Sequence, residues 1–167
     1  MIKIENDPIL HTACKTVSEE SLANFEIEIK PIAKLLIDTM FEHNAYGVSA
    51  CQIGIDLAMF AMCIYGSVKV CINPQIVAAS LNMTKDVEGC LSFPNLRLYV
   101  KRPESVVVRY YTIEGQEITE QLDGITARVW LHEYDHCNGI CFTDRVGKLS
   151  LQMAKKRKEK QAKKDKK

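Results

Sequence analysis

The sequence of 167 residues lacks the features that mark several large classes of protein. It has only eight glycines and five prolines, with no internal repeat and no linker-like stretch, which excludes collagen-like and low-complexity chains. No hydrophobic run approaches the ~20 residues that a membrane-spanning helix needs, so we expect no membrane association. Hydrophobic residues make up 47% and charged residues 26%, which is typical of one globular domain with a substantial core.

The cysteines also lack the pattern of a disulfide-stabilised secreted protein. Their number, seven, is odd, and their spacing is not paired. The first ten residues, MIKIENDPIL, show no basic segment followed by an apolar one, as a secretory signal would. We therefore expect a reducing, cytoplasmic location in which most thiols act as small buried hydrophobic groups, while one thiol can serve as a metal ligand or nucleophile.

Charge is unevenly distributed along the chain, although the net charge is only +1. Residues 155–167 contain nine basic and two acidic side chains, whereas residues 1–154 contain 13 basic and 19 acidic ones. The last segment has a composition that suits a helix but no apolar face. We therefore predict a compact domain over residues 1–153 and a basic, flexible tail over residues 154–167 that becomes helical only on a partner.

The hydrophobic periodicity predicts helices near both ends of the domain and strands between them. The helices are expected at residues 31–44 and 124–138, the second capped by Asp123 and stopped by Gly139. Its apolar residues surround much of the circumference, so this helix should be buried in the middle of the domain. Strands are expected where short apolar segments are bounded by glycine or proline, at residues 57–66, 67–72, 74–80, 104–113 and 116–122.

Two turns are expected among these strands. Glu114-Gly115 should form a hairpin turn, and residues 87–95 should form a turn that ends at Pro94. The whole pattern predicts an α+β fold with mostly antiparallel sheets around the buried central helix.

The central helix carries the sequence His132-Glu133-Tyr134-Asp135-His136. Because positions i and i+4 share one helix face, the two imidazoles can bind one metal ion, and Glu133 can act as a general base beside it. The alternative is a pair of core histidines, each bonded to a neighbour. Burying two histidines and a glutamate without a metal would carry a large desolvation penalty, which favours the metal site.

Two histidines leave a divalent metal ion short of protein ligands. The chain has no histidine after His136, and two of its three later acidic residues lie in the basic tail. We expect the third ligand upstream, in Glu88-Gly89-Cys90-Leu91-Ser92, where Gly89 would allow a tight turn that points Cys90 into the site. The alternative for Cys90 is a small buried hydrophobic residue.

A third segment, residues 47–54 with the sequence GVSACQIG, is rich in small side chains. Small residues let a ligand approach the backbone closely, and the Gln52 amide can donate a hydrogen bond. The alternative is a tight loop packed under a sheet.

The three segments, in this order, resemble the motifs of the peptide deformylases, metallohydrolases that remove the formyl group from the N-terminal methionine of new proteins. The family patterns GxGLAAxQxG, EGCLS and HExDH correspond to AYGVSACQIG, EGCLS and HEYDH in this chain. The resemblance extends over residues 5–150. It implies that residues 1–153 form the catalytic domain and that the basic tail lies outside it.

The resemblance also implies a role for each matching residue. The metal ligands would be Cys90, His132 and His136, and Glu133 would be the general base and acid. The Gln52 side-chain amide and the Leu91 backbone N–H would stabilise the oxyanion. The substrate-binding residues would be Tyr46, Gly47, Gly89, Arg128 and Val129. We assign Arg97 and Arg102 no role beyond support of the loop.

The cofactor implied by the resemblance is one divalent metal ion, Fe²⁺ in the cell, although a Cys-His₂ site also accepts Zn²⁺, Ni²⁺ or Co²⁺. The implied substrates are N-formyl-methionyl nascent peptides, and we expect the protein to be a monomer. We hypothesise that the basic tail, Lys155–Lys167, binds the ribosome through RNA phosphates. The alternative is a tail that only keeps the protein soluble.

The chain departs from the family pattern at Ala45, Val48, Ser49 and Cys137, all small changes. Arg128 is more unusual, because it lies one turn before His132 where the family keeps an apolar residue near the methionine pocket. Either its guanidinium extends to water, or it narrows the mouth of the pocket or contacts the peptide backbone.

Two other functions compete with deformylation. A general HExxH peptidase would lack a downstream third ligand and would leave EGCLS unexplained. A nucleic-acid-binding module with an inactive site would leave the complete set of catalytic residues unexplained.

Overall fold

The structure is a computed structural model, and it describes residues 1–164. Its helices are α1 (Glu19–Ala23), α2 (Phe25–Glu28), α3 (Lys30–Glu42), α4 (Gly124–Cys137) and α5 (Lys148–Lys164), with 3₁₀ turns η1 (Pro8–His11), η2 (Ala50–Ile53) and η3 (Phe142–Arg145). Its strands are β1 (Gly47–Ser49), β2 (Met59–Ile64), β3 (Ser67–Ala79), β4 (Met83–Cys90), β5 (Phe93–Pro103), β6 (Ser105–Tyr111) and β7 (Glu117–Asp123). None of the helices in the described part is long and apolar enough to cross a membrane.

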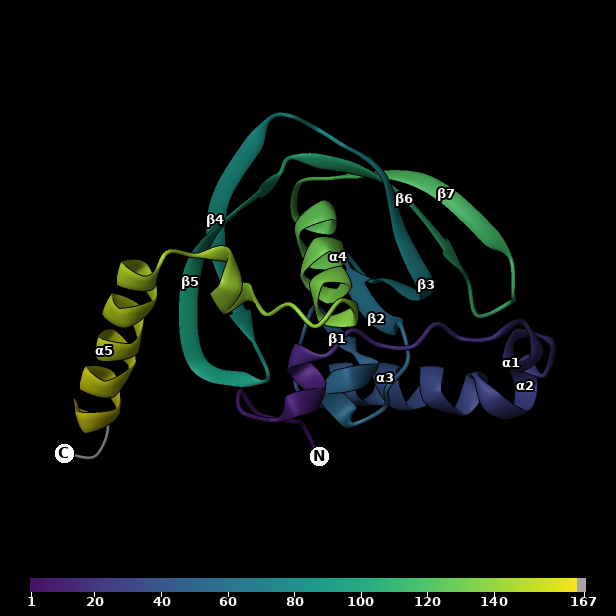
Figure 1. Ribbon diagram of the computed structural model, residues 1–167, viewed down its shortest axis with the longest axis horizontal. Coiled ribbons are helices and arrows are strands. Elements are labelled where there is room, and N and C mark those ends of the chain that lie inside the picture. Colours follow the sequence, from purple (N-terminus) through teal and green to yellow (C-terminus); the bar gives the residue numbers. More distant parts are fainter. Residues whose placement is uncertain (165–167) are drawn as a thin grey trace.

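The strands form two sheets with antiparallel pairing throughout. The larger sheet has the order β1-β2-β3-β6-β7, and the smaller one is the β4–β5 hairpin. Helix α4 stands between them, with β3, β6 and β7 curving over it, the β4–β5 hairpin beside it and α3 below (Figure 1). The predicted α+β class with mostly antiparallel sheets is confirmed.

Helix α4 is buried on nearly every face because both sheets pack against it. Trp130 is fully buried. Its ring meets that of Phe60 on β2 edge-on, with 5.7 Å between the ring centroids, and stacks on the ring of Tyr134, with 5.1 Å between the centroids. The helix begins after Asp123, but the prediction that Asp123 caps it was wrong, because its side chain makes no capping hydrogen bond. The helix ends before Gly139, which has a φ of 68°. The predicted bounds of this helix are therefore correct to within one residue.

Pro74 does not separate two strands, as the sequence predicted, but lies inside β3. The register of β3 with β6 shifts between Ile72 and Gln75, and Asn73 has a φ of 51°. Such a bulge leaves a residue outside the ladder, so the missing N–H of the proline interrupts no regular pair. The prediction of two strands was wrong because a bulge is not visible in the hydrophobic pattern.

The turn expected over residues 87–95 is much shorter in the structure. Strand β4 continues to Cys90 and β5 begins at Phe93, so Pro94 lies in a strand. Gly89 pairs with Arg97 in the ladder, and the register shifts immediately after it. The expectation that Gly89 forms a tight turn was wrong: the pairing of β4 with β5 and the shift after Gly89 place Cys90.

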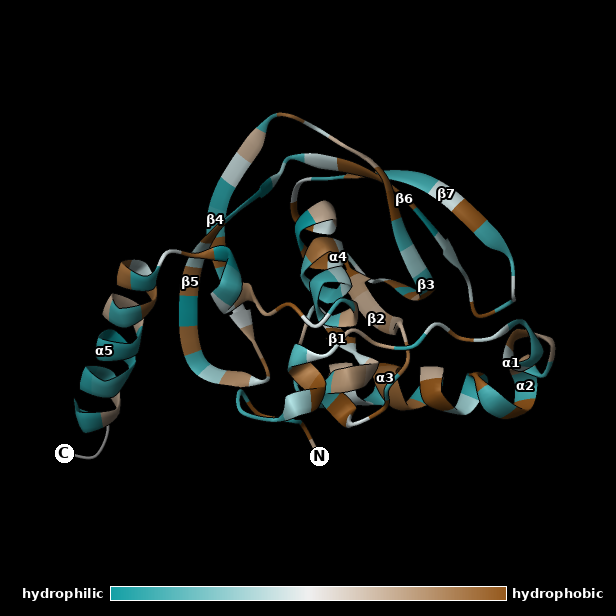
Figure 2. Cartoon of the chain, in the orientation of Figure 1, coloured by the Kyte–Doolittle hydropathy of each residue, from teal (hydrophilic) through white to brown (hydrophobic). Residues whose placement is uncertain are grey.

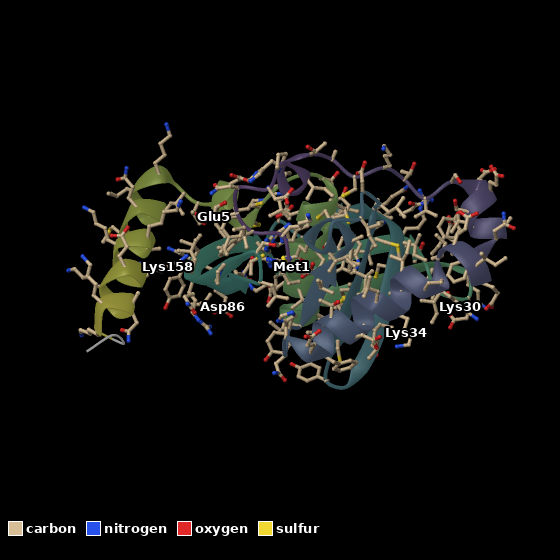
Figure 3. The ribbon with its side chains drawn as sticks, turned by 90° about the horizontal axis from the view of Figure 1, so that it is seen from below. Met1, Glu5, Lys30, Lys34, Asp86 and Lys158 are labelled. Carbon is tan, nitrogen blue, oxygen red and sulfur yellow. The ribbon has the colours of Figure 1, made fainter. Side chains whose placement is uncertain are left out.

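The boundary predicted at residues 153 and 154 falls inside α5. This helix lies against β5 (Figure 1), with Ala154 buried and Leu151 half-buried in the same apolar cluster. Beyond Ala154 the helix is strongly hydrophilic (Figure 2), and its side chains, Lys158 among them, project at one end of the molecule (Figure 3). The expectation that this segment becomes helical only on a partner was wrong for residues 154–164, because α5 continues through them from a start packed against β5. Flexibility of the tail stays a prediction, and residues 165–167 lie outside the described residues.

Two glycines with left-handed backbone allow a test of how α4 is anchored at its end. A Cβ at Gly139 would lie 2.7 Å from the backbone of Thr12, whereas a Cβ at Gly115, with a φ of 74°, would meet nothing within 4 Å. We expect Gly115→Ala to lower the free energy of unfolding by roughly 1–2 kcal/mol, the usual cost of that conformation. Gly139→Ala should lower it further because Thr12 must move. Urea unfolding measures both, and equal losses would contradict this account.

Candidate active site

Three potential metal donors from two elements meet beside the central helix. Cys90 ends β4, while His132 and His136 lie one turn apart on α4. One donor atom of each lies within 4.8 Å of the other two, and Cys90 Sγ is 3.3 Å from His136 Nε2. The structure thus brings together the three residues that the sequence motifs singled out.

A buried carboxylate orients one of the two imidazoles. His132 Nδ1 lies 2.9 Å from Glu88 Oε2 and donates to it, which leaves Nε2 as the free nitrogen of that ring. A carboxylate partner of this kind fixes the tautomer and orientation of a ligating histidine. Within residues 1–164, the buried Nδ1 of His136 has no hydrogen-bond partner.

The Glu88 carboxylate accepts hydrogen bonds from three side chains, those of Arg102, Arg128 and His132. Its Oε1 accepts from Arg102 Nε at 2.6 Å and Arg128 Nη1 at 2.8 Å, and its Oε2 accepts from Arg102 Nη2 at 2.9 Å as well as from His132. Burial would raise the pKa of Glu88, but the hydrogen bonds from His132 and Arg102 outweigh it and lower the pKa to about 2. Glu88 is the first residue of the EGCLS motif, yet the sequence analysis gave it no role.

Arg102 extends this network along α4. Its Nη1 lies 2.8 Å from Asp135 Oδ2, and Asp135 is also bound by Arg145. Arg102 is buried in this network, whereas Arg97, the other arginine noted in the sequence, is exposed on the cleft. Arg102 therefore links two buried carboxylates and is not confined to supporting a loop.

Glu133 is buried beside the three donors and faces β1. Its Oε2 accepts a hydrogen bond from Ser49 Oγ at 2.6 Å, and a Cβ at Gly47 would lie 2.7 Å from its Oε1. Burial raises the pKa of Glu133 above its usual range, against the opposing effects of His132 and the Ser49 hydroxyl. The close approach explains physically why a glycine precedes the small residues of this segment.

Gln52 places its amide between η2 and the β4–β5 turn. Its Nε2 donates to Cys90 Sγ at 3.3 Å and to Ser92 Oγ at 3.1 Å, while its Oε1 accepts from the Ser49 N–H at 2.9 Å. Gln52 is buried and held from both sides, so its amide is fixed toward Cys90. Leu91, half-buried, lies in the turn that follows Cys90.

A cleft of about 740 Å³ opens onto these groups. Its lining includes all five residues predicted to bind substrate, namely Tyr46, Gly47, Gly89, Arg128 and Val129. Gln52, Cys90, His132 and Glu133 also line it. The sequence analysis missed the apolar wall residues Val87 and Ile125, whose position on the cleft follows only from tertiary packing.

Arg128 does not extend to water, so that interpretation of its role was wrong. The side chain is buried, and its guanidinium donates to Glu88, to the Val100 carbonyl at 3.1 Å, and to the carbonyl and hydroxyl of Thr84, both at 3.1 Å. It binds a carboxylate inside the protein because the neighbouring strands supply acceptors there. A contact of Arg128 with substrate stays a prediction.

The chemistry of the three donors fits a transition-metal ion. A thiolate and two imidazoles form a set that Zn²⁺, Fe²⁺, Co²⁺ and Ni²⁺ accept, and three protein ligands leave a position open, as in catalytic sites. The Glu88 carboxylate on Nδ1 of His132 supplies the outer hydrogen bond that such sites use.

Comparisons with known proteins agree on one family. The family model described as "Polypeptide deformylase" matches residues 1–152. The peptide deformylase of Thermotoga neapolitana is 33% identical over 156 residues, which cover 93% of this chain and 92% of the relative. That of Rhodopirellula baltica is 36% identical over 146 residues, 84% of this chain and 72% of the relative.

Solved structures lead to the same family. A Synechococcus elongatus peptide deformylase in complex with actinonin superposes with a TM-score of 0.87 at 32% identity, covering 95% of this chain and 85% of that chain. A Legionella pneumophila peptide deformylase gives a TM-score of 0.87 at 28% identity, covering 99% and 96%. The likeness therefore includes the fold as a whole and is not limited to the motifs.

The buried charges yield a stability prediction. The Arg102 side chain is 4% exposed and the Arg145 side chain 44% exposed, although both bind Asp135. Arg102→Met would remove a buried cationic partner from both Glu88 and Asp135, so it should lower the free energy of unfolding by about 3–5 kcal/mol. Arg145→Met should lower it by about 1 kcal/mol or less. Urea unfolding compares the two, and similar losses would mean that the Arg102 network does not stabilise the fold.

Proposed function

Because this chain belongs to the peptide deformylase family, we propose that it cleaves the formyl group from N-formyl-methionyl nascent peptides with Cys90, His132 and His136 as metal ligands and Glu133 as the base. The chain is a hydrolase, and its family removes the N-terminal formyl group of newly made polypeptides. The observation that carries the residue assignments is the meeting of three donor atoms within 4.8 Å, beside a buried carboxylate and at a cleft.

The metal site would hold one divalent ion, Fe²⁺ in the cell, with Zn²⁺, Ni²⁺ or Co²⁺ as substitutes. When bound there, such an ion supplies Lewis acidity that polarises the formyl carbonyl and makes water a better nucleophile. The chain contributes the geometry: β4 presents the Cys90 thiolate, and α4 presents both imidazoles.

Glu133 moves the proton in this mechanism. Ser49 holds one carboxylate oxygen, Oε2, so the other oxygen can face the attacking water. The carboxylate accepts the water proton at Oε1 as the new C–O bond forms at the formyl carbon. It then delivers that proton to the leaving amine nitrogen, which gives formate and a free N-terminus.

The formyl oxygen becomes negatively charged during the attack. The Gln52 Nε2–H, already directed at Cys90 Sγ, and the Leu91 backbone N–H would donate hydrogen bonds to it. Donors that are fixed before the reaction stabilise such charge without reorganising, and losing one costs roughly 100- to 1000-fold in rate.

The cleft would hold the peptide. Tyr46, Gly47 and Gly89 would lie along its backbone, and Val129 with Arg128 would border the methionine side chain. Gly47 lies against Glu133 and has no side chain, so the substrate can approach this base closely.

The single experiment that tests this function is formate release from formyl-Met-Ala-Ser together with the metal content of the protein. Met-Ala-Ser and a general peptidase substrate are the controls. Rapid formate release with neither control cleaved supports a deformylase. Cleavage of internal peptide bonds would instead indicate the HExxH peptidase, and no reaction with any substrate would indicate a binding module.

The Glu133 assignment gives a separable prediction. Glu133→Gln should retain metal, since this residue is not a ligand, and should slow formate release by about 100- to 10,000-fold because the proton acceptor is lost. Cys90→Ala should lose the metal as well as the activity. Exposed Glu114→Gln serves as the matched control and should behave as the wild type. Near-normal turnover of Glu133→Gln would refute the assignment.

The basic part of α5 is proposed to bind the ribosome, with the protein otherwise acting as a cytoplasmic monomer. Seven lysines and arginines follow Ala154 within the described helix, against one glutamate, and nearly all are exposed. Such segments bind phosphate backbones through counterion release. Truncation after Met153 would remove Ala154 from the contact with β5, so substitutions are the better test.

We therefore expect the triple variant Lys155→Gln, Lys156→Gln, Lys160→Gln to weaken co-sedimentation with ribosomes while keeping its rate on short formyl-peptides. Binding by the wild-type chain should fall steeply as salt rises. The matched control is the variant Lys30→Gln, Lys34→Gln, because both lysines lie on α3 far from α5 (Figure 3). It should co-sediment with ribosomes as the wild-type chain does. If the α5 variant sediments as the wild type does at low salt, the basic segment serves solubility alone.

A further inference from the structure

Arg128 is a buried cation that belongs to none of the three sequence motifs. It lies one helical turn before His132 on α4, and only 6% of it is exposed. A guanidinium in such a place is stable only if its donors are satisfied, and Glu88, Thr84 and Val100 satisfy them. Its principal charged partner, Glu88, is the carboxylate that holds His132 Nδ1.

We propose that Arg128 is a positioning residue that fixes Glu88, and through Glu88 the His132 imidazole, in the orientation required for metal binding. This inference rests on the proposed function, in which His132 is a ligand. Arg128 approaches Glu88 Oε1 while His132 occupies Glu88 Oε2, so the two α4 residues hold opposite oxygens of one carboxylate. With Arg128 in place, Glu88 cannot rotate away from His132 without breaking a buried ion pair.

The same side chain also fixes the distance between the two elements that share the metal donors. Cys90 belongs to β4, and both imidazoles belong to α4. Arg128 crosses from α4 to the Thr84 carbonyl on β4 and to the Val100 carbonyl on β5. It therefore ties the helix to the hairpin one turn before His132, which with His136 and Cys90 would hold the metal ion.

Arg102 binds the same carboxylate, but its contacts differ from those of Arg128. Arg102 comes from β5, the partner strand of β4, and reaches α4 through the Asp135 carboxylate and the Leu131 carbonyl. Besides His132 itself, Arg128 is the α4 side chain that binds Glu88 directly. A lysine could keep the charge but not the contacts, because one ammonium cannot donate in the planar fork that spans Glu88, Thr84 and Val100.

The competing role for Arg128 is that of a wall of the substrate cleft, which it also lines. The two roles differ in what they change. A wall residue alters the Michaelis constant for formyl-peptides and leaves metal binding untouched. A positioning residue alters the affinity for the metal ion, even without substrate.

The test is titration of the metal-free full-length protein with Co²⁺ under anaerobic conditions, read by the thiolate-to-cobalt absorption and by competition with a chelator. We expect Arg128→Met to weaken Co²⁺ binding by about 10- to 100-fold, as loss of an outer hydrogen-bonding partner typically does. Arg128→Lys should recover part of the loss. The matched control is Arg145→Met, because Arg145 binds a buried carboxylate of α4 that does not contact His132; it should bind Co²⁺ as the wild type does.

A double variant tests whether Arg128 acts through Glu88. In a Glu88→Gln background, Arg128→Met should add little further loss of Co²⁺ affinity, whereas losses that simply multiply would overturn the route through Glu88. The near-UV circular dichroism of buried Trp130 reports whether each variant is folded, and Arg128→Lys carries the test if Arg128→Met does not fold. Wild-type Co²⁺ affinity and spectrum in the folded Arg128 variants would overturn the proposal. If the wild-type protein itself binds no Co²⁺ through Cys90, the proposed function fails instead.

Discussion

One buried carboxylate, that of Glu88, joins the central helix to the small sheet. It receives hydrogen bonds from Arg102 on β5 and from Arg128 and His132 on α4, all within 2.9 Å. Buried charges are costly unless every partner is in place, so this cluster tolerates only a narrow range of distances between helix and hairpin. The positions of Cys90 and the two histidines follow from that constraint, because they lie on the same two elements.

The surroundings of the two buried glutamates, Glu88 and Glu133, shift their pKa values in opposite directions. Burial would raise the pKa of Glu88, but His132 and Arg102 outweigh it, lower the pKa to about 2 and keep the carboxylate ionised. Glu133 meets a serine hydroxyl and the wall formed by Gly47, and burial raises its pKa. Carboxylates whose environments push their pKa values apart divide into a fixed structural anion and a group that can exchange a proton. The fold supplies the first carboxylate, Glu88, from β4 and the second, Glu133, from α4, where it faces β1.

The sequence predicted those parts of the site that depend on local spacing. Helical periodicity predicted the ends of α4 and the shared face of its two histidines, and the deformylase motifs singled out Cys90 and Gln52. Outside the site, turn chemistry predicted the Glu114-Gly115 turn between β6 and β7. The role of Glu88 and the buried state of Arg128 could not be predicted, because their partners are 14 to 44 positions away in the chain. The continuity of β3 through Pro74 likewise depends on a bulge against β6, which no local pattern encodes.

Two of the positions at which the sequence departs from the motif pattern, Ser49 and Arg128, contact the two buried glutamates of the site. Ser49 stands where the motif pattern has an alanine, and its hydroxyl donates a hydrogen bond to the carboxylate of Glu133, the proposed base. Arg128 stands where the resemblance implies an apolar residue, and its guanidinium binds the Glu88 carboxylate that orients His132. Ser49 donates to Glu133 and Arg128 donates to Glu88. Both polar side chains are compatible with burial because each has a buried carboxylate as its hydrogen-bond acceptor. Ser49 and Arg128 therefore alter the electrostatics around the proposed base and the proposed metal ligand His132 without altering those residues.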